Sequence, residues 1–236
     1  MMKPSSPPQF TPPTRLATLL EFRAPLDSLS LALKLPKLRN APIGDGRPVL
    51  LLPGFKADVY SMWPLKRYLR RLGYDTYDWS LGRNDGNVDR MVERMTPQVA
   101  QVAESTDEAV TLIGWSLGGV VARELARLYP DTVREVITMG TPIVGGPKYT
   151  AAGDTYARDY QLDLDVFEQE VHARNSIGIK QPVTSIYSRQ DGIVSWRASV
   201  DTYNPQARNI EVYGSHLGLG VNATVWRHIA DILAAS

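Results

Sequence analysis

Beyond residue 45, short apolar runs alternate with longer segments whose apolar residues recur at helical spacing. The run at residues 49–52 is apolar throughout, which is typical of a strand buried on both faces of a parallel sheet. The predicted strands cover residues 49–52, 75–79, 109–115, 133–139, 183–188 and 209–213. The predicted helices cover residues 63–72, 88–104, 117–129 and 222–234, with Gly73 ending the first and Pro97 predicting a kink or break in the second.

This alternation predicts an α/β fold, with a mostly parallel sheet covered by helices on both faces. The chain has 236 residues, which suits one large domain that we expect to span residues 45–236.

The alternation fails between residues 145 and 181, where acidic residues and aromatic residues are interleaved. A stretch this long is too long for a simple connection, so we expect an inserted helical cap. It follows a strand, at the sheet edge where open parallel sheets place their sites. The alternative is a surface excursion with no role.

The N-terminal region divides into two parts. Residues 1–13 contain five prolines and predict a flexible tail. Residues 14–44 are expected to form an arm that packs on the body of the domain. Within it, residues 16–35 are apolar-rich, but four charged residues and Pro25 interrupt them, so no transmembrane span or stable membrane insertion is expected. An amphipathic segment that lies on a membrane is the alternative.

Composition narrows the possible partners. The chain has 26 basic and 25 acidic residues and a net charge of +1. This balance gives no excess of positive charge for binding nucleic acid or an anionic membrane. It has no cysteine, which excludes disulfides, thiol catalysis and thiolate metal sites. A cytoplasmic location is the default expectation. The sequence leaves the oligomeric state open.

A candidate catalytic motif, Gly-Trp-Ser-Leu-Gly-Gly, occupies residues 114–119 between a predicted strand and a predicted helix. A serine hydroxyl is a poor nucleophile and must be presented to a base, and a very tight strand-to-helix turn does this when small residues flank the serine. Ser116 is therefore the predicted nucleophile.

A nucleophilic serine needs a base, and the chain offers His172, His216 and His228. His228 falls in the predicted C-terminal helix, where a structural role is the simpler interpretation, and His172 falls in the predicted cap. His216 follows the last predicted strand, so its loop can bring the imidazole to the serine. We therefore expect His216 to be the base.

The imidazole must be oriented by a carboxylate. Asp191 follows the strand at 183–188, at the same sheet edge and one strand before His216. The order Ser116, Asp191, His216 is that of α/β-hydrolases. Asp201 is the alternative carboxylate, farther along the chain. Aspartates that precede glycine in turns are also common for backbone reasons alone.

The reaction also needs donors for the negative charge that develops on a carbonyl oxygen. The backbone N–H of Leu117 is expected to be one, because it starts a helix. Phe55, in the loop after the first strand, is the second candidate, with Gly54 allowing a close approach to substrate. A simple Pro-Gly turn is the alternative interpretation of this loop.

From residue 47 onward, about four-fifths of the chain, the sequence resembles the α/β-hydrolase superfamily and its bacterial lipase and esterase group. The motifs that carry the resemblance are Leu-Leu-Pro-Gly-Phe at 51–55, the serine turn, residues 122–126, Gly-Thr-Pro at 140–142 with Gly145, residues 191–194 and the His216 loop. The family often has a histidine where Pro53 stands. The resemblance implies an α/β-hydrolase fold with a small cap, and a serine hydrolase that needs no cofactor or metal.

Trp115, Gly54 and Pro142 are the expected substrate contacts, and a small-molecule ester or lipid is the expected substrate. Because the predicted cap has no long apolar helix, we expect short-to-medium acyl chains. Three alternatives stay open: acyl transfer to another nucleophile, including peroxide; a binding protein that keeps the fold without the chemistry; and a peripheral membrane protein anchored by residues 16–35.

Overall fold

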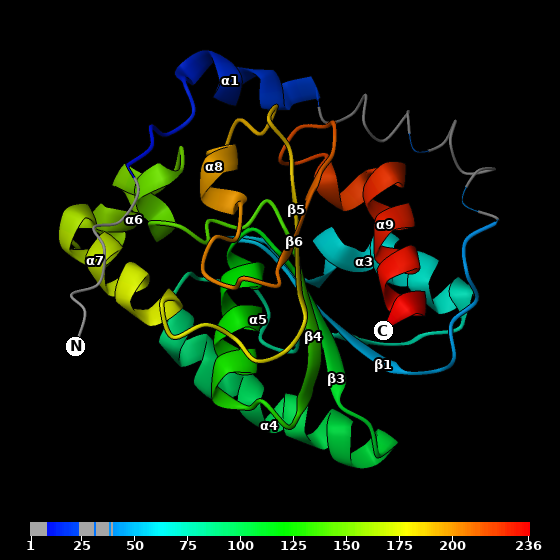
Figure 1. Cartoon of the computed structure of the whole chain (residues 1–236). Helices are drawn as coiled ribbons and strands as arrows, with labels where there is room; N and C mark the ends of the chain where they lie inside the picture. The colour runs from blue at the N-terminus through cyan, green and yellow to red at the C-terminus, as the bar shows by residue number, and fades with distance from the viewer. Residues whose placement is uncertain (1–8, 24–30, 32–37, 39) are drawn as a thin grey trace.

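The computed structural model describes residues 9–23, 31, 38 and 40–236. Its centre is a six-stranded sheet with the order β2-β1-β3-β4-β5-β6, and every neighbouring pair is parallel (Figure 1). The strands are β1 (Pro48–Leu52), β2 (Asp75–Asp78), β3 (Val110–Trp115), β4 (Val133–Met139), β5 (Val183–Tyr187) and β6 (Arg208–Glu211). The strand order reverses at β1, so the crevice beside β1 and β3 is the place where such sheets bind ligands.

Helices cover both faces of the sheet, with α3 and α9 on one side and α4 and α5 on the other (Figure 1). These four are α3 (Val59–Leu72), α4 (Val88–Thr106), α5 (Leu117–Leu128) and α9 (Ala223–Ala235). The short helix α8 (Trp196–Ser199) and the 3₁₀ segment η3 (Leu219–Val221) lie in the loops that follow β5 and β6. The predicted α/β class, with a parallel sheet between two helical layers, is confirmed.

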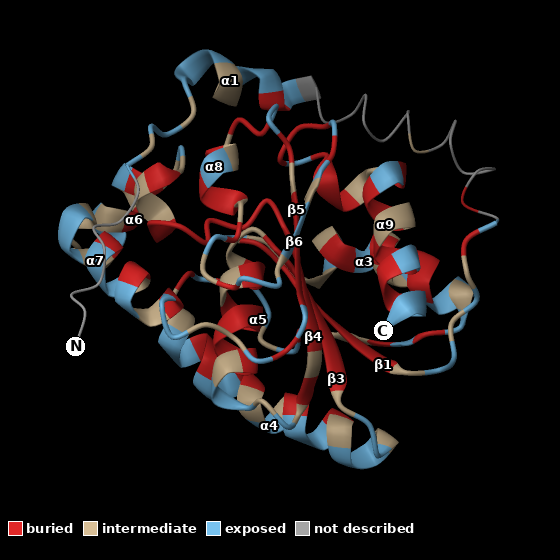
Figure 2. Cartoon of the chain, in the orientation of Figure 1, coloured by how far each residue is buried: buried red, intermediate tan, exposed pale blue. Residues whose placement is uncertain are grey.

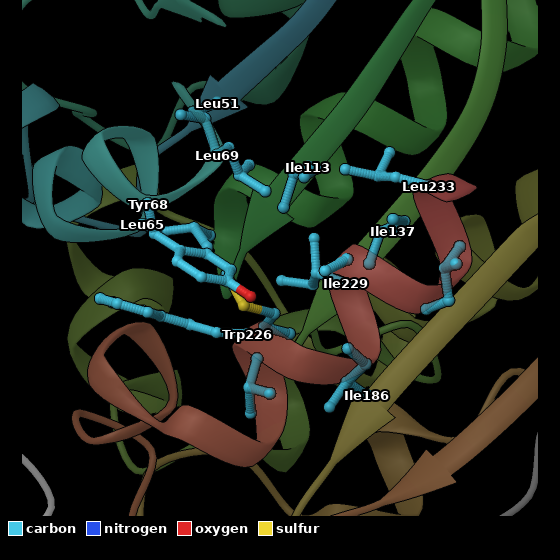
Figure 3. Close-up of a cluster of buried hydrophobic side chains, with 14 of the residues drawn as sticks. Leu51, Leu65, Tyr68, Leu69, Ile113, Ile137, Ile186, Trp226, Ile229 and Leu233 are labelled. Atoms are coloured by element: carbon cyan, nitrogen blue, oxygen red, sulfur yellow. The ribbon is translucent and has the colours of Figure 1, made fainter. Parts of the chain in front are cut away.

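Two apolar cores lie on opposite faces of the sheet, because alternate residues of each strand point to opposite sides. Leu51, Ile113 and Ile137 pack with α3 and α9, and Figure 3 shows Leu51 beside Leu69 of α3 and Ile137 beside Ile229 of α9. Their strand neighbours, such as Leu50 and Leu112, pack with α4 and α5. The central strands β1, β3, β4 and β5 are consequently buried along almost their whole length, whereas the edge strands β2 and β6 are partly exposed (Figure 2).

Helix ends differ from the predicted ones where a capping residue decides them. The helix expected at 63–72 begins earlier, at Val59, because the Asp58 carboxylate accepts the Tyr60 N–H at 3.0 Å. It ends at Gly73, whose φ of 101° is left-handed. The break expected at Pro97 is absent, since α4 continues through that residue to Thr106.

The segment predicted as a cap contains the 3₁₀ segment η2 (Gly146–Tyr149) and the helices α6 (Gly153–Tyr160) and α7 (Leu164–Asn175). Two tyrosines of α6 fasten it to the loop after β2: the Tyr156 and Tyr160 hydroxyls donate to the Gly86 and Asp85 carbonyls at 2.7 and 2.6 Å. At the far end of α7, the Asn175 side chain donates to the Ile143 carbonyl at 2.8 Å.

The N-terminal region has two short helical pieces, α1 (Arg15–Leu19) and the 3₁₀ segment η1 (Leu20–Arg23). They lie at the end of the sheet where β5 and β6 finish, at the top of Figure 1. Most of the predicted amphipathic segment at 16–35, and residues 1–8 of the predicted tail, lie outside the described residues. In the described part of the chain, no helix has the length and apolar character to span a membrane.

The close approach of α5 to β1 depends on Gly118. A Cβ built on Gly118 would lie 2.2 Å from the Leu52 carbonyl oxygen, which is backbone and cannot turn away. We therefore expect Gly118→Ala to lower the free energy of unfolding by about 1–3 kcal/mol or more, measured by urea denaturation.

Gly220→Ala is the matched control, because the nearest atom to its added Cβ lies at 3.6 Å, an ordinary contact. We expect that variant to unfold close to the wild-type midpoint. Equal midpoints for Gly118→Ala and the wild type would contradict the packing described here.

Candidate active site

Ser116 lies at the turn between β3 and α5, with φ 53° and ψ −124°. A non-glycine residue in such a conformation costs of order 1–3 kcal/mol and persists only where its surroundings hold it. Three hydrogen bonds hold this one: its N–H donates to the Met139 carbonyl at 2.8 Å, and its carbonyl accepts from Thr141 Oγ1 at 2.9 Å and from the Gly119 N–H at 3.0 Å.

Asp191 and His216 are hydrogen-bonded, with Asp191 Oδ2 and His216 Nδ1 2.6 Å apart. The second oxygen of Asp191 accepts the N–H groups of Ile193 and Val194 at 2.9 and 2.7 Å, so the carboxylate is fixed by its own loop. A carboxylate accepts only, which places the proton on Nδ1 and leaves Nε2 as the acceptor. Both side chains are buried, with exposed fractions of 6% and 3%.

The pKa of the His216 imidazole is raised above its ordinary value. Burial acts to lower it, but the charge of Asp191 and its hydrogen bond favour the protonated ring, and the charge of Glu21 adds to them. Gly140, at the end of β4, lies against this pair. Its φ is 55°, and a Cβ there would lie 2.9 Å from His216 Nδ1 and 3.0 Å from Asp191 Oδ2.

Ser116 and His216 line one cavity of about 390 Å³. This volume is within the usual range of small-molecule sites. The predicted contacts Gly54, Phe55, Leu117, Trp115 and Pro142 line it as well. Much of the remaining wall is apolar and includes Tyr156, Phe167 and Val171 of the segment predicted as a cap. The sheet edge and the cap therefore enclose the space above the serine.

Three of these predicted site residues, Gly54, Trp115 and Phe55, contact other parts of the candidate site. A Cβ built on Gly54 would lie 3.2 Å from Ser116 Cβ, so the backbone there approaches the serine closely. The Trp115 ring lies 6.0 Å from the His216 ring and also belongs to the core beside α3. The Phe55 ring meets the Tyr156 ring of the cap edge-on at 5.8 Å.

The alternative carboxylate, Asp201, and the two other histidines do not take part in the Asp191–His216 pair. Asp201 forms a buried ion pair with Arg123 at 2.6 Å and accepts the Tyr203 and Asn204 N–H groups. His172, in α7, is 3.0 Å from the Tyr203 hydroxyl through Nδ1. His228 is half-buried in α9.

Sequence reasoning missed two buried residues of the site. Asn84, in the loop after β2, is fully buried and bonded to the β1–α3 loop, residues 53–58. Its side-chain amide donates to the Pro53 carbonyl at 2.9 Å, and its backbone exchanges hydrogen bonds with Lys56 and Ala57 at 2.7 and 2.8 Å. Its position in a turn-rich loop gave no sign of this burial.

The second residue, Glu21, was counted only as a charge that interrupts the N-terminal arm. Its carboxylate is buried and accepts the N–H groups of Gly192, His216 and Leu217. These residues lie far along the chain from Glu21, and no local pattern marks the contact. Within the described ranges, no cluster of three or more acidic or histidine side chains is arranged to hold a metal ion.

Comparison with known structures supports the architecture. A Bacillus licheniformis lipase in its mature form superposes with a TM-score of 0.62 at 12% identity, covering 82% of this chain and 94% of that one. A Paleococcus ferrophilus monoacylglycerol lipase gives a TM-score of 0.57 at 18% identity, covering 83% and 96%. At these identities the likeness concerns the fold alone.

Sequence relatives are more limited in extent. The chain is 28% identical over 135 residues to a Pseudoalteromonas atlantica pimeloyl-(acyl-carrier protein) methyl ester esterase, covering 57% of this chain and 50% of that protein. A Salmonella heidelberg protein of the same name is 42% identical over 60 residues, 22% of its length. The chain thus spans half or less of these relatives. A family model described as the alpha/beta hydrolase fold matches residues 47–167, just over half of the chain, and the protein therefore belongs to the alpha/beta hydrolase fold family.

Proposed function

We propose that the protein is a serine hydrolase that cleaves carboxylic esters through an acyl-enzyme. The observation that carries this proposal is the buried Asp191–His216 pair, of which His216 lines one cavity together with Ser116. The proposal is strengthened by the relatives, whose names describe a methyl ester esterase and lipases.

In the proposed reaction, His216 Nε2 takes the Ser116 proton as the serine oxygen attacks the ester carbonyl. Asp191 balances the charge of the resulting imidazolium through Nδ1. His216 then gives the proton to the departing alcohol, leaving an acyl group on Ser116. In the second half, His216 removes a proton from water, the hydroxide attacks the acyl carbonyl, and the proton returns to Ser116 as the acid leaves.

Two backbone N–H groups are proposed to hold the developing oxyanion. Leu117 is the first residue of α5, so its N–H is at the positive end of the helix dipole. Phe55 lies in the β1–α3 loop, whose Gly54 is close to the serine. Rigid donors of this kind lower the barrier because they need no reorganisation during the reaction.

The cavity favours an apolar acyl group. Aromatic and aliphatic side chains from the β1–α3 loop, β3 and the cap line it. Tyr156 and Tyr160 fasten the cap to the loop after β2, and Asn175 fastens it to the loop after β4. The cap is therefore held over the serine at both of its ends. We therefore propose esters of short-to-medium acyl chain as substrates.

The first test is hydrolysis of p-nitrophenyl esters of increasing acyl length by the wild type and by Ser116→Ala. We expect the highest kcat/KM at short-to-medium chains and a fall in kcat of at least about 10³-fold in the variant. Ser80→Ala changes an exposed serine that does not line the cavity, so this control should retain full activity.

Labelling with a fluorophosphonate separates this proposal from a protein that only binds ligands. The wild type and Ser80→Ala should each take up one label, and Ser116→Ala none. Full activity in Ser116→Ala, or a wild type that neither reacts nor labels, would refute the proposal.

The pH dependence follows from the raised pKa of His216. The base must be neutral, so kcat/KM should fall as the pH drops through the pKa of His216, and this acidic limb should lie above the ordinary histidine value of about 6.5. In Asp191→Asn the raising charge is lost. Its limb should therefore move to lower pH while kcat falls about 10⁴-fold. An acidic limb below pH 6 in the wild type would contradict the role given to Asp191.

Asn84→Ala tests the β1–α3 loop. The change removes the bond to the Pro53 carbonyl and leaves that buried oxygen unpaired, which costs about 1–3 kcal/mol. We expect a fall in the free energy of unfolding of that size, a lower kcat at nearly constant KM, and faster hydrogen exchange in residues 53–58. Arg83→Ala changes the exposed neighbour and should leave all three unchanged. Unaltered exchange in Asn84→Ala would show that the loop is held by other contacts.

A further inference from the structure

The N-terminal arm contributes one buried carboxylate to the back of the candidate site. Glu21, in η1, has an exposed fraction of 4%. Its Oε1 accepts the N–H of Gly192 at 2.7 Å and that of His216 at 2.9 Å, and its Oε2 accepts the N–H of Leu217 at 2.9 Å. Gly192 follows Asp191 directly, and the other two donors are His216 itself and its neighbour. One side chain thus joins the loops that carry the acid and the base.

The arm buries a charged side chain and exposes its large apolar ones. Leu16, Leu19 and Phe22 have exposed fractions of 68%, 61% and 83%, and no residue of α1 is buried. Among residues 9–22, Glu21 is the one buried residue. An arm that served only to cover the core would bury its leucines and expose its carboxylate. The side chain that enters the body here is the charged one.

Further contacts hold the arm against the same loop. Thr18 Oγ1 donates to the Gly192 carbonyl at 2.8 Å. A Cβ on Gly192 would lie 2.2 Å from the Ala17 carbonyl oxygen, so the two backbones touch. Among the described residues no cation pairs with Glu21, and its charge is met by the backbone N–H groups alone. A buried carboxylate without its donors is strongly destabilised, so the bonds and the burial depend on each other.

From this geometry we propose that Glu21 is a positioning residue, which fixes the His216 imidazole against Asp191 by joining the two loops through their backbone. The proposal rests on the proposed function. The loops are also joined farther from the cavity, where Ser188 Oγ donates to the Gly214 carbonyl at 2.6 Å. Glu21 provides the connection beside the reacting groups, where a displacement of about 1 Å lowers the rate by about 10²-fold.

Glu21 also acts on the imidazole through its charge. Two carboxylates, Asp191 from the β5–α8 loop and Glu21 from the arm, raise the pKa of His216 against the effect of burial. Asp191 acts through its charge and its hydrogen bond to the ring nitrogen, and Glu21 acts through its charge. Neutralising Glu21 should therefore lower the pKa of His216, whereas a purely mechanical contact would leave it unchanged.

The test compares Glu21→Gln and Glu21→Ala with the wild type, and Glu93→Gln is the control because it removes an exposed carboxylate from α4. Activities on a short p-nitrophenyl ester are normalised to the fraction labelled by fluorophosphonate. We expect kcat to fall about 10²-fold in Glu21→Ala and less in Glu21→Gln, with KM within about threefold of the wild type. The acidic limb of kcat/KM should move to lower pH in Glu21→Gln and stay in place in Glu93→Gln.

A readout without catalysis comes from proton NMR titration of the three histidines. In Glu21→Gln, the titration of His216 should move to lower pH, while those of His172 and His228 stay fixed. An unchanged kcat and an unchanged His216 titration in folded Glu21→Gln would overturn the proposal. If the wild type itself neither hydrolyses esters nor labels, the proposed function fails, and the NMR titration still decides whether Glu21 controls the imidazole.

Discussion

The backbone of Ser116 is the constraint on which the rest of the site depends. Its dihedral angles are unfavourable for any residue with a side chain, and they persist because β3, β4 and α5 meet around it. Gly118 permits the close approach of α5 to β1, and the Thr141 hydroxyl donates a hydrogen bond to the Ser116 carbonyl. The cores on the two faces of the sheet supply the packing energy that maintains this turn.

The parallel sheet explains why residues far apart in sequence meet. Every strand runs in the same direction, so the loops after β1, β3, β4, β5 and β6 leave from one edge. The strand order reverses beside β1, and the Gly54 loop and Ser116 lie close together at this point of the sheet edge. Each loop then contributes one kind of group: backbone donors, a hydroxyl, a close-lying glycine, a carboxylate or an imidazole. The cap encloses the space that they surround.

The sequence allowed prediction of the strands, because they depend on local patterns, and local patterns also indicated the candidate site residues. Residues 49–52 are apolar on both faces, Ser116 lies between small residues, and Asp191 and His216 each follow a strand. The support of these groups could not be predicted in this way. Asn84 resembles any turn residue, and its burial follows from the path of the β1–α3 loop. The cap of α3 by Asp58 and the unbroken course of α4 through Pro97 were also missed, since tertiary packing decides them.

The contact between the arm and the loops that carry Asp191 and His216 affects the order in which the molecule folds. Glu21 is separated from its partners by 171, 195 and 196 positions. During synthesis the three donors therefore leave the ribosome long after the arm does. Contacts of such long sequence separation form late, because a large loop must close first. The sheet and its cores can therefore assemble before this contact forms, and the candidate site is complete only when the arm has met the loops after β5 and β6.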